Sequence, residues 1–435
     1  MSLPLQLAFF TALGLSMVDA QAVFAHYMVQ SIDGSTDHAY QDIQSAMAVG
    51  FEAFALNLGS TADWVDDTVS QLFKQAEGTD FKLFLSFDMY QNSDLDQHIP
   101  LFQQYQDHPN YYRAGPDNFP VVSSYGGYNE SDAWGSFKSN TPVYLLLNLD
   151  DNYAGQGDSS PYFTDPRGQL SNFNDIVDGY FSWESTWPAS NNGPANVSAD
   201  GDVTLIEFSH NARKDYMMGI SPLQYKNLQG STWYRVGEVN LPRRMTQILE
   251  IKPDFAEFIT WNDAGESHYI GNVWEDGYDP TILTYANNDQ WPHYAWQPLV
   301  TSFINAYKSG VTADRMQPPA DDPIGVMWYR GMLKHCVDNP PRNADAALDA
   351  VNFAIVLPSS SEGMQAQVSS GGNVLTTIQL HPGLNYAAVT DMVVGNQTVN
   401  LLDTDGNVVM GASSTSEVTD DSECNFNYYV VGLTK

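Results

Sequence analysis

Two carboxylates lie three positions apart in the segment FITWNDAGESHYI, which runs from residue 258 to residue 270. Asp263 and Glu266 follow an apolar run, and only Ala264 and Gly265 separate them. Two unpaired acids beside a buried strand end are costly unless they have a function. Two carboxylates, one as acid and one as base or nucleophile, are also the minimum that hydrolysis of a glycosidic bond requires. The sequence therefore predicts that Asp263 and Glu266 form such a pair.

The spacing of this pair does not decide the stereochemistry of a reaction. Inversion needs about 6.5–9.5 Å between the two carboxyl groups, and retention needs about 5–5.5 Å. A D-x-x-E span reaches either separation, because the turn between the acids can be extended or helical. Both outcomes therefore stay open on the local sequence.

Other common catalytic motifs are absent from the sequence. It contains no His-Glu-x-x-His, no paired Cys-x-x-Cys and no Gly-x-Ser-x-Gly. The first two motifs are typical of zinc sites, and the third is typical of serine hydrolases. We therefore expect no metal and no other cofactor.

Eight apolar runs alternate with helix-patterned segments before residue 311. Near-continuous hydrophobic strands that alternate with helices indicate a parallel sheet covered by helices. Eight such units predict an α/β fold with a closed (β/α)8 barrel of the TIM type, and an open doubly wound sheet is the alternative. No glycine-rich phosphate turn follows the first run, which counts against a nucleotide-binding sheet. The runs cover residues 22–29, 50–59, 81–89, 119–127, 142–150, 176–185, 215–223 and 255–263.

The pattern changes after NPPRNADAA, residues 339–347. Runs of period two take over, and Gly371-Gly372 and Asp405-Gly406 indicate hairpin turns. This stretch predicts a small C-terminal antiparallel β-sandwich. We therefore expect a catalytic barrel over residues 21–338 and a β-sandwich domain over residues 339–435.

The chain has two cysteines, Cys336 and Cys424. Two cysteines in a secreted chain most simply form one disulfide. With Cys336 at the exit of the barrel and Cys424 near the last strand, we expect the bridge to pin the sandwich to the barrel.

In a barrel of this kind, catalytic groups lie at the carboxyl ends of the strands. A mouth lined with polar groups and flat aromatic faces suits a sugar polymer, because rings stack on the C–H faces of sugars and carboxylates accept hydroxyl hydrogen bonds. Each candidate also has a structural alternative: an acid can cap a turn, a histidine can sit in the core, and an aromatic ring can fill space. The polar candidates are His26, Asn57, Asp88, Glu184, Asn262 and His268, and the aromatic ones are Tyr125, Trp183, Tyr225, Trp233 and Trp261.

Charge and the amino terminus indicate a secreted protein. The chain has 18 Lys and Arg against 52 Asp and Glu, for a net charge of −34, which disfavours nucleic acid and anionic membranes as partners. Residues 3–18 form a short apolar run followed by small residues, so we expect a signal peptide over residues 1–20. Three sequons predict N-glycosylation at Asn129, Asn196 and Asn396. We expect an extracellular or cell-wall monomer.

Several longer motifs together resemble one known family. They are FAHYMV, GFEAFALNLG, FLSFDM, GYFSWES and WYRVGEVNLPRRMTQILEIKPDFAEFITWNDAGESHYIG. This set resembles the fungal α-1,3-glucanases, or mutanases, of glycoside hydrolase family 71, over essentially the whole mature chain. The resemblance implies a (β/α)8 barrel with a C-terminal β-domain, secretion, and endo-acting hydrolysis of α-1,3-glucan with inversion.

The same resemblance implies roles for individual residues. Asp263 and Glu266 become the acid and base, without an order between them, and Arg235 and Glu238 join the substrate-binding or site-supporting groups. Glu184 and Tyr125 differ from the residues that the family pattern would place there. These differences bear on the exact subsite specificity and mode of attack more than on the reaction itself. The alternatives are a non-catalytic glucan-binding protein on a decayed barrel, and a retaining glycosidase or transglycosylase acting on another α-glucan. The predicted substrate-binding set is His26, Asn57, Asp88, Tyr125, Trp183, Tyr225, Trp233, Arg235, Glu238, Trp261, Asn262 and His268.

Overall fold

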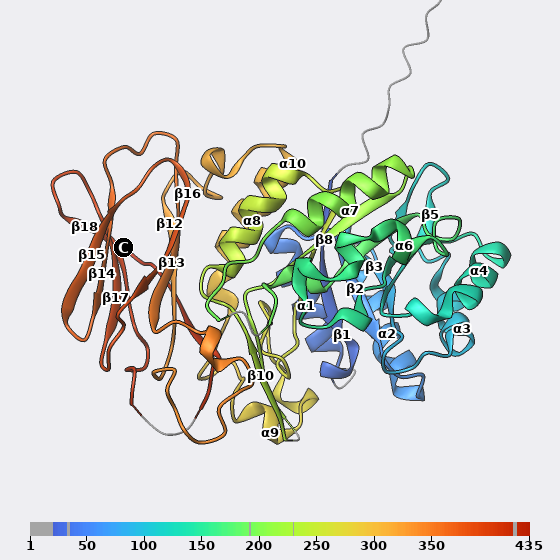
Figure 1. Ribbon diagram of the computed structural model, residues 1–435, viewed down its shortest axis with the longest axis horizontal. Helices are drawn as coiled ribbons and strands as arrows, with labels where there is room; N and C mark the ends of the chain where they lie inside the picture. Colours follow the sequence, from blue (N-terminus) through green and yellow to red (C-terminus); the bar gives the residue numbers. More distant parts are fainter. Residues whose placement is uncertain (1–20, 33–34, 191–192, 229, 421–423) are drawn as a thin grey trace, which may run out of the picture.

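The computed structural model describes residues 21–32, 35–190, 193–228, 230–420 and 424–435. Eight parallel strands run in the order β3–β2–β1–β11–β8–β7–β6–β5, and β3 also pairs with β5, so the sheet closes into a barrel (Figure 1). The predicted closed barrel is confirmed, and the open doubly wound sheet is excluded. The strands are β1 (Ala22–Met28), β2 (Ala53–Leu58), β3 (Lys82–Asp88), β5 (Phe119–Tyr125), β6 (Tyr144–Asn148), β7 (Gly179–Ser182), β8 (Asp215–Ile220) and β11 (Phe255–Phe258).

Burial on both faces explains why these strands have continuous apolar sequences. All six residues of β2 are buried, and so are six of the seven residues of β1. One face points into the barrel and the other packs under helices, so most positions on both faces are apolar. The two-residue strand β4 (Arg113–Ala114) extends the sheet by pairing with β5.

Helices cover the outside of the barrel (Figure 1). α2 shows how they do so: Val65, Val69, Leu72 and Phe73 are buried at helical spacing, while acidic residues occupy its first turn. After β6 a long loop with two short helices, α5 and α6, stands in place of a full covering helix. The helices are α1 (Thr36–Val49), α2 (Asp63–Ala76), α3 (Leu95–Tyr105), α4 (Ser131–Asn140), α5 (Pro161–Thr164), α6 (Pro166–Leu170), α7 (Asp200–Asn211), α8 (Asn240–Ile251), α9 (Pro280–Leu283) and α10 (Gln297–Lys308). Among the described helices, none is both long and apolar enough to cross a membrane.

A hairpin that the sequence did not predict follows β8. Its strands, β9 (Gln224–Leu228) and β10 (Ser231–Arg235), pair in an antiparallel register before the chain enters α8. The hairpin extends beyond the carboxyl end of the barrel, and Figure 1 shows β10 beside α9 at that end. It therefore adds a wall to the mouth of the barrel.

Two four-stranded antiparallel sheets form the C-terminal β-sandwich, as predicted (Figure 1). The Gly371–Gly372 and Asp405–Gly406 turns connect β14 with β15 and β17 with β18, also as predicted. The inner sheet runs β16 (Gly383–Thr390), β13 (Ala350–Leu357), β12 (Ile324–Arg330), β19 (Tyr428–Gly432), and the outer sheet runs β15 (Asn373–Gln379), β14 (Gln365–Ser370), β17 (Gln397–Leu402), β18 (Val408–Ser413).

The central strands of the inner sheet, β12 and β13, are buried on both faces. Met327 and Tyr329 of β12 belong to the sandwich core, whereas Val326 and Trp328, on the opposite face, belong to the barrel core. α10 packs against β12 and β13. β12 lies before the expected boundary at residues 338 and 339 but pairs with β13 and β19 of the sandwich. β12 is buried on both faces and lacks the alternation of the later strands, so its sequence does not distinguish it from a barrel strand.

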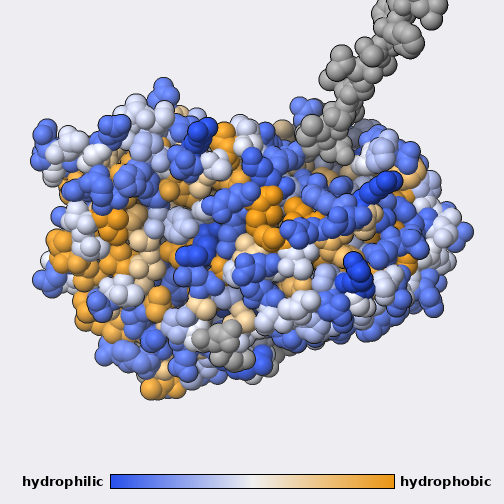
Figure 2. All heavy atoms as spheres, turned by 45° about the horizontal axis from the view of Figure 1, so that its top comes forward, coloured by the Kyte–Doolittle hydropathy of each residue, from blue (hydrophilic) through white to orange (hydrophobic). Residues whose placement is uncertain are grey.

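Much of the outer surface is polar. Figure 2 shows polar residues over much of this face, with hydrophobic residues gathering toward the sandwich end. Val374, Val393, Val394 and Val408 are exposed there. Asn129, Asn196 and Asn396 are exposed, which is compatible with the predicted glycans.

Cys336 and Cys424 form the predicted disulfide, with their Cα atoms 5.5 Å apart. The bridge does not pin the sandwich directly to the barrel, as we expected it to do. Cys336 follows β12 and Cys424 precedes β19, so both ends belong to connections of the sandwich. The bridge ties these two connections together, and a separate hydrogen bond from the Tyr225 hydroxyl to the Cys424 carbonyl (2.8 Å) links this point to the hairpin.

We predict that Cys336→Ser combined with Cys424→Ser lowers the free energy of unfolding by about 2–5 kcal/mol, because the bridge closes an 88-residue loop of the unfolded chain. Thermal and denaturant unfolding of the oxidised parent and the double variant would measure this difference. Equal stabilities would show that the bridge contributes nothing to the fold.

Candidate active site

The carboxyl ends of the barrel strands open into a cavity of about 1030 Å³. Its walls come from the ends of β2, β3 and β5, from the loops after β6 and β7, from the β9–β10 hairpin and from the loop after β11. This volume lies at the upper end of the usual range for ligand pockets, about 300–1,000 Å³. Its lining includes Asn57, Asp88, Tyr125, Asp151, Trp183, Glu184, Gln224, Lys226, Trp233, Arg235, Asp263, Glu266, Tyr278, Arg342 and Asn343.

Asp263 and Glu266 face this cavity from one tight loop after β11. The Glu266 backbone N–H donates to Asp263 Oδ1 at 3.0 Å, and the Asp263 N–H donates to Thr260 Oγ1 at 2.8 Å. Ser267 has a φ of 60°, in the left-handed region, which turns the chain back toward the barrel. The loop therefore holds the Asp263 carboxylate by its own backbone.

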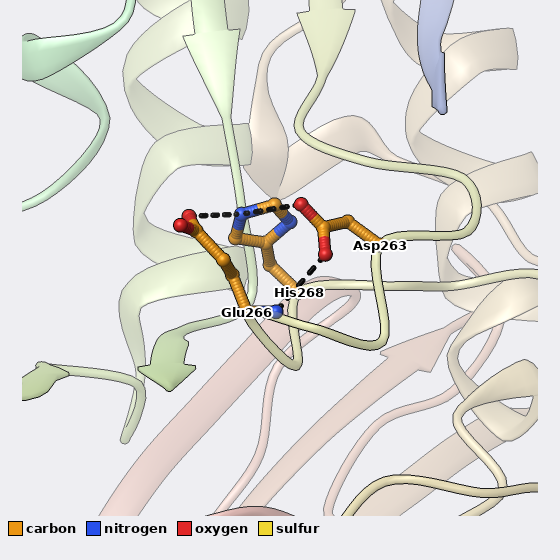
Figure 3. Close-up of side chains that lie close together, drawn as sticks. All are labelled: Asp263, Glu266 and His268. Carbon is orange, nitrogen blue, oxygen red and sulfur yellow. Dashed lines mark hydrogen bonds and ion pairs between the residues drawn. The ribbon is translucent and has the colours of Figure 1, made fainter. Parts of the chain in front are cut away.

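His268 lies behind the pair (Figure 3). Its Nε2 is 3.3 Å from Glu266 Oε2 and 4.0 Å from Asp263 Oδ2, and its Nδ1 is 3.3 Å from Thr260 Oγ1. The imidazole is fully buried, whereas the two carboxylates retain some exposure to the cavity. His268 therefore contacts both acids without reaching the open part of the site.

The hairpin reaches Glu266 from the other side. The Gln224 amide nitrogen donates to Glu266 Oε2, and Lys226 Nζ lies 3.5 Å from Glu266 Oε1. The Tyr225 N–H donates to the Glu266 carbonyl at 2.9 Å, which fixes the strand against the loop. Hydrogen bonds and charge on both oxygens favour the ionised form of Glu266.

The two carboxyls consequently differ in acidity. Burial opposes ionisation of Glu266, but His268, Lys226 and Gln224 outweigh it and lower the pKa to about 2. Burial raises the pKa of Asp263; His268 opposes this shift, and the charge of Glu266 adds to it. The opposite shifts favour one protonated and one ionised carboxyl in the site, which is the state that acid–base hydrolysis needs.

A second acidic group lies on the facing wall. Glu184, on the loop after β7, forms an ion pair with Arg235 of the hairpin, with Nη1 3.0 Å from Oε2 and Nη2 donating to Oε1 at 3.2 Å, and it accepts the Gly155 N–H at 2.6 Å. Asp150 accepts from the Glu184 N–H at 3.1 Å. Burial, together with the charge of Glu184, raises the pKa of Asp150 to about 7. Glu184 thus joins three segments of the wall and is buried.

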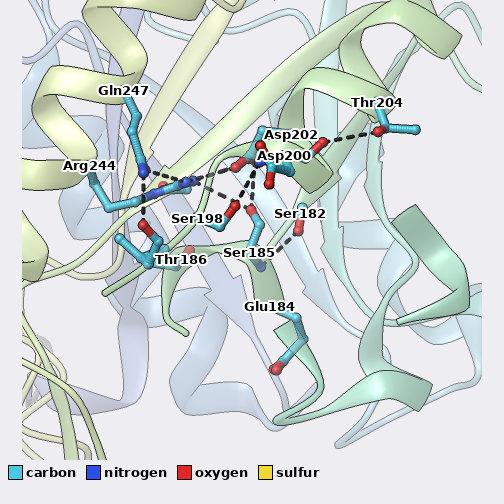
Figure 4. A network of polar contacts seen from close by, with 12 residues as sticks. Ser182, Glu184, Ser185, Thr186, Ser198, Asp200, Asp202, Thr204, Arg244 and Gln247 are labelled. Carbon is cyan, nitrogen blue, oxygen red and sulfur yellow. Dashed lines mark hydrogen bonds and ion pairs between the residues drawn. The ribbon is translucent and has the colours of Figure 1, made fainter. Parts of the chain in front are cut away.

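A buried ion pair anchors the same loop from behind (Figure 4). Arg244 of α8 donates to Asp202 of α7 at 2.7 Å, and the Ser185 hydroxyl donates to Asp202 at 2.8 Å. Figure 4 shows Glu184 directed away from this network. The buried network therefore holds one side of the loop, and Glu184 on the other side contacts Arg235.

The predicted substrate-binding residues divide into three groups. One group lines the cavity, a second lies buried directly behind its wall, and a third lies away from it. The lining group is Asn57, Asp88, Tyr125, Trp183, Trp233 and Arg235; the buried supports are His26, Asn262 and His268; and the distant group is Tyr225, Glu238 and Trp261.

Three predicted contacts are therefore corrected. Tyr225 alternates with Gln224 and Lys226 on β9, so its ring points to the opposite face and packs near Phe426. Glu238 accepts the Leu348 N–H at 2.8 Å, at the junction with the sandwich. Trp261 is fully buried and packs near Phe54. The sequence does not show which face an aromatic or acidic residue near a strand end occupies.

Other lining residues were missed by the sequence analysis. Gln224 and Lys226 belong to the unpredicted hairpin, and their alternate spacing was the only available signal. Arg342 and Asn343 come from the segment before β13, where the Arg342 backbone pairs with β10. No pattern in the sequence indicates that residues after 339 reach the mouth of the barrel.

Asp263, Glu266 and His268 offer three atoms within 4.8 Å of one another, close enough to hold a metal ion. Lys226 bears on this possibility, because its ammonium lies 3.5 Å from Glu266 Oε1 and would repel a cation. The site is thus better suited to a proton or a sugar hydroxyl than to a metal.

The model of a protein family described as "Glycosyl hydrolase family 71" matches residues 19–435 of this chain. It is 31% identical to a mutanase of Penicillium rubens over 435 residues, covering 97% of this chain and 90% of the relative. It is 29% identical to a glucan endo-1,3-alpha-glucosidase of Schizosaccharomyces pombe, covering 84% and 80%, and 25% identical to an ascus wall endo-1,3-alpha-glucanase of the same yeast, covering 86% of each.

Among solved structures, the chain resembles a GH99 endo-alpha-mannosidase from Bacteroides thetaiotaomicron. The TM-score is 0.51 and the identity 12%, over 67% of this chain and 98% of the other. At this identity the likeness concerns the barrel fold alone.

Lys226→Met should move the acid limb of the pH–activity profile to higher pH. Removing the ammonium raises the pKa of Glu266 from its value of about 2, and a neighbouring opposite charge is worth about 1–3 pKa units. Because a base must be ionised, activity would then begin to fall at a higher pH as the solution is acidified. Lys252→Met, a change at an exposed lysine that contacts the Gly310 carbonyl, is the matched control. An acid limb that does not move would show that Lys226 does not set the ionisation of Glu266.

Proposed function

The chain belongs to glycosyl hydrolase family 71, and from this premise we propose that it is a secreted endo-acting enzyme that hydrolyses α-1,3-glucosidic bonds of α-1,3-glucan. The names of its relatives, a mutanase and a glucan endo-1,3-alpha-glucosidase, support this substrate. The observation that carries the proposal is the pair of carboxyls with opposite pKa shifts at the cavity.

In the proposed reaction, Asp263 is the general acid and Glu266 is the general base. The Asp263 proton passes to the glycosidic oxygen as the bond from this oxygen to C1 breaks. Water attacks C1 from the opposite face, and Glu266 accepts the proton that the water loses. The hydrogen bonds from Gln224 and Lys226 keep Glu266 ionised while Asp263 carries the proton.

The other lining residues support a sugar substrate. Trp183, Trp233 and Tyr125 present aromatic surface at the cavity, while Asp88 and Arg235 offer an acceptor and a donor. Apolar faces with a few fixed polar groups suit the alternating C–H and hydroxyl faces of a glucose chain. A non-catalytic glucan-binding protein would need the same walls but not the opposed carboxyls. Release of reducing sugar from insoluble α-1,3-glucan separates the two proposals.

Secretion is proposed on several features of the chain. The predicted signal peptide falls on residues 1–20, which lie outside the described residues. The disulfide suits an oxidising compartment, and the asparagine of each sequon is exposed. We propose an extracellular or cell-wall location, and a monomer remains our prediction.

A retaining reaction on an α-glucan is a second candidate, and one distance favours it. Facing oxygens of Asp263 and Glu266 lie within 4.8 Å of each other. This approach is closer to the spacing of retaining enzymes, about 5–5.5 Å, than to the 6.5–9.5 Å that leaves room for a water. In that case Glu266 would attack C1 while Asp263 protonates the departing glycosidic oxygen, and water would then hydrolyse the glycosyl ester with Asp263 accepting its proton.

The stereochemistry of the first product separates these reactions. For inversion, which we propose from the family resemblance, the first reducing end released from an α-linked glucan has the β configuration. Proton NMR during the first minutes of hydrolysis would detect it before mutarotation. An initial α-anomer would overturn inversion and support the retaining candidate.

Asp263→Asn and Glu266→Gln should each lower the turnover rate by about 10²–10⁴-fold with the fold intact. The amides keep the shape of the side chains but cannot transfer the proton. Asp88→Asn should cost less than either change, because Asp88 is proposed as a substrate contact.

Binding of insoluble α-1,3-glucan and the melting temperature serve as controls and should be retained in all three variants. If Asp88→Asn were as damaging as one member of the pair while the other member was nearly silent, Asp88 would take the place of the silent residue.

A further inference from the structure

We propose that Glu257, His26 and Asn57 form a relay that presents the side-chain oxygen of Asn57 to the cavity as an acceptor for one substrate hydroxyl. In this relay His26 and Glu257 are positioning residues that do not touch the sugar. That the ligand is a sugar rests on the proposed function. The relay itself consists of contacts within the protein and does not depend on that function.

The three residues come from neighbouring strands of the barrel. Glu257 lies on β11, His26 on β1 and Asn57 on β2, in the sheet order β2–β1–β11. Glu257 Oε1 is 2.8 Å from His26 Nδ1, and Asn57 Nδ2 is 3.1 Å from His26 Nε2. Glu257 and His26 are fully buried, and Asn57 is 3% exposed. The relay therefore runs from the barrel interior to the wall of the cavity.

The carboxylate sets the direction of the hydrogen bonds. A carboxylate only accepts, so His26 Nδ1 must carry the hydrogen that points to Glu257. In a neutral imidazole the other nitrogen is then an acceptor, and a partner on one nitrogen commonly fixes the tautomer in this way. His26 Nε2 therefore accepts from the amide nitrogen of Asn57.

A second neighbour favours the same orientation of the amide. Burial raises the pKa of Asp88, and the nearby Asn57 side chain is among the neighbours that oppose this shift by favouring the ionised carboxylate. The amide nitrogen has two hydrogens, one for His26 and one for Asp88. Turning the amide over would place its oxygen against the Asp88 carboxylate, which electrostatic repulsion disfavours.

This arrangement leaves the amide oxygen without a protein partner. Asn57 Oδ1 is buried and accepts no hydrogen bond from the described residues, yet Asn57 lines the cavity. A buried acceptor without a donor is unfavourable, so a ligand hydroxyl at this point gains a bond and removes a penalty.

Fluorine substitution tests the direction of the bond, because fluorine cannot donate a hydrogen bond. The probes are an α-1,3-linked glucose oligosaccharide and its monodeoxyfluoro derivatives, bound to the Asp263→Asn variant so that no hydrolysis occurs. We expect one derivative to bind about 10-fold more weakly than the parent sugar, the equivalent of one lost hydrogen bond.

This 10-fold loss should disappear when Asn57→Ala is added and should persist with Gln91→Ala, a control on the same wall. Glu257→Gln should shrink the loss, because a glutamine can donate to His26 Nδ1 and so permit the opposite amide orientation. A loss that persists in the Asn57→Ala background, or equal binding of every derivative, would overturn the proposal.

The ¹⁵N spectrum of the imidazole nitrogens tests the relay without a ligand. We expect His26 to carry hydrogen on Nδ1 only, with the resonance assigned through His26→Gln, and we expect Glu257→Gln to change the tautomer ratio. A protonated Nε2 in the parent protein would overturn the relay. If no oligosaccharide binds at all, the proposed function fails, and the nitrogen spectrum still decides the relay.

Discussion

The site depends on holding two neighbouring carboxyls in different protonation states. Like charges this close cannot both form at little cost, so the surroundings must favour one. Glu266 receives the hydrogen bonds and the positive charge, from His268 behind it and from Gln224 and Lys226 in front. Asp263 shares the burial but lacks direct contact with the lysine or the glutamine, and its pKa is raised. The chemistry proposed for the chain follows from this unequal division of partners.

That division requires elements from three parts of the chain. The loop after β11 supplies both acids, and the β9–β10 hairpin supplies the groups that stabilise Glu266. The sandwich in turn supports the hairpin: the Tyr225 hydroxyl donates to the Cys424 carbonyl, and the backbone of Arg342 pairs with β10. The inner sheet is buried against the barrel through Trp328, whose indole N–H donates to the Glu238 carbonyl at 2.7 Å. The C-terminal region is therefore part of the framework of the site and not an independent attachment.

The sequence predicted the barrel because its strands are buried on both faces and therefore have continuous apolar runs. The pair of carboxylates was also predictable, since the apolar run before Asp263 identifies a strand end. The hairpin was not predicted, because Gln224 and Lys226 are polar residues turned toward a cavity and break the hydrophobic pattern of a strand. Tyr225 and Trp261 were misplaced because residue type does not reveal which face of a strand a side chain occupies. The pKa difference depends on contacts between segments about 40 residues apart, which no local pattern records.

The protonation states of the two carboxyls can be observed directly. Neutron diffraction from crystals held at pH 3.8, the ordinary pKa of an aspartate carboxyl, would locate the hydrogens. Because the pKa of Asp263 is raised and that of Glu266 is about 2, the account predicts deuterium on the carboxyl of Asp263 and none on Glu266. Deuterium on Glu266 with a bare Asp263 carboxylate would contradict it.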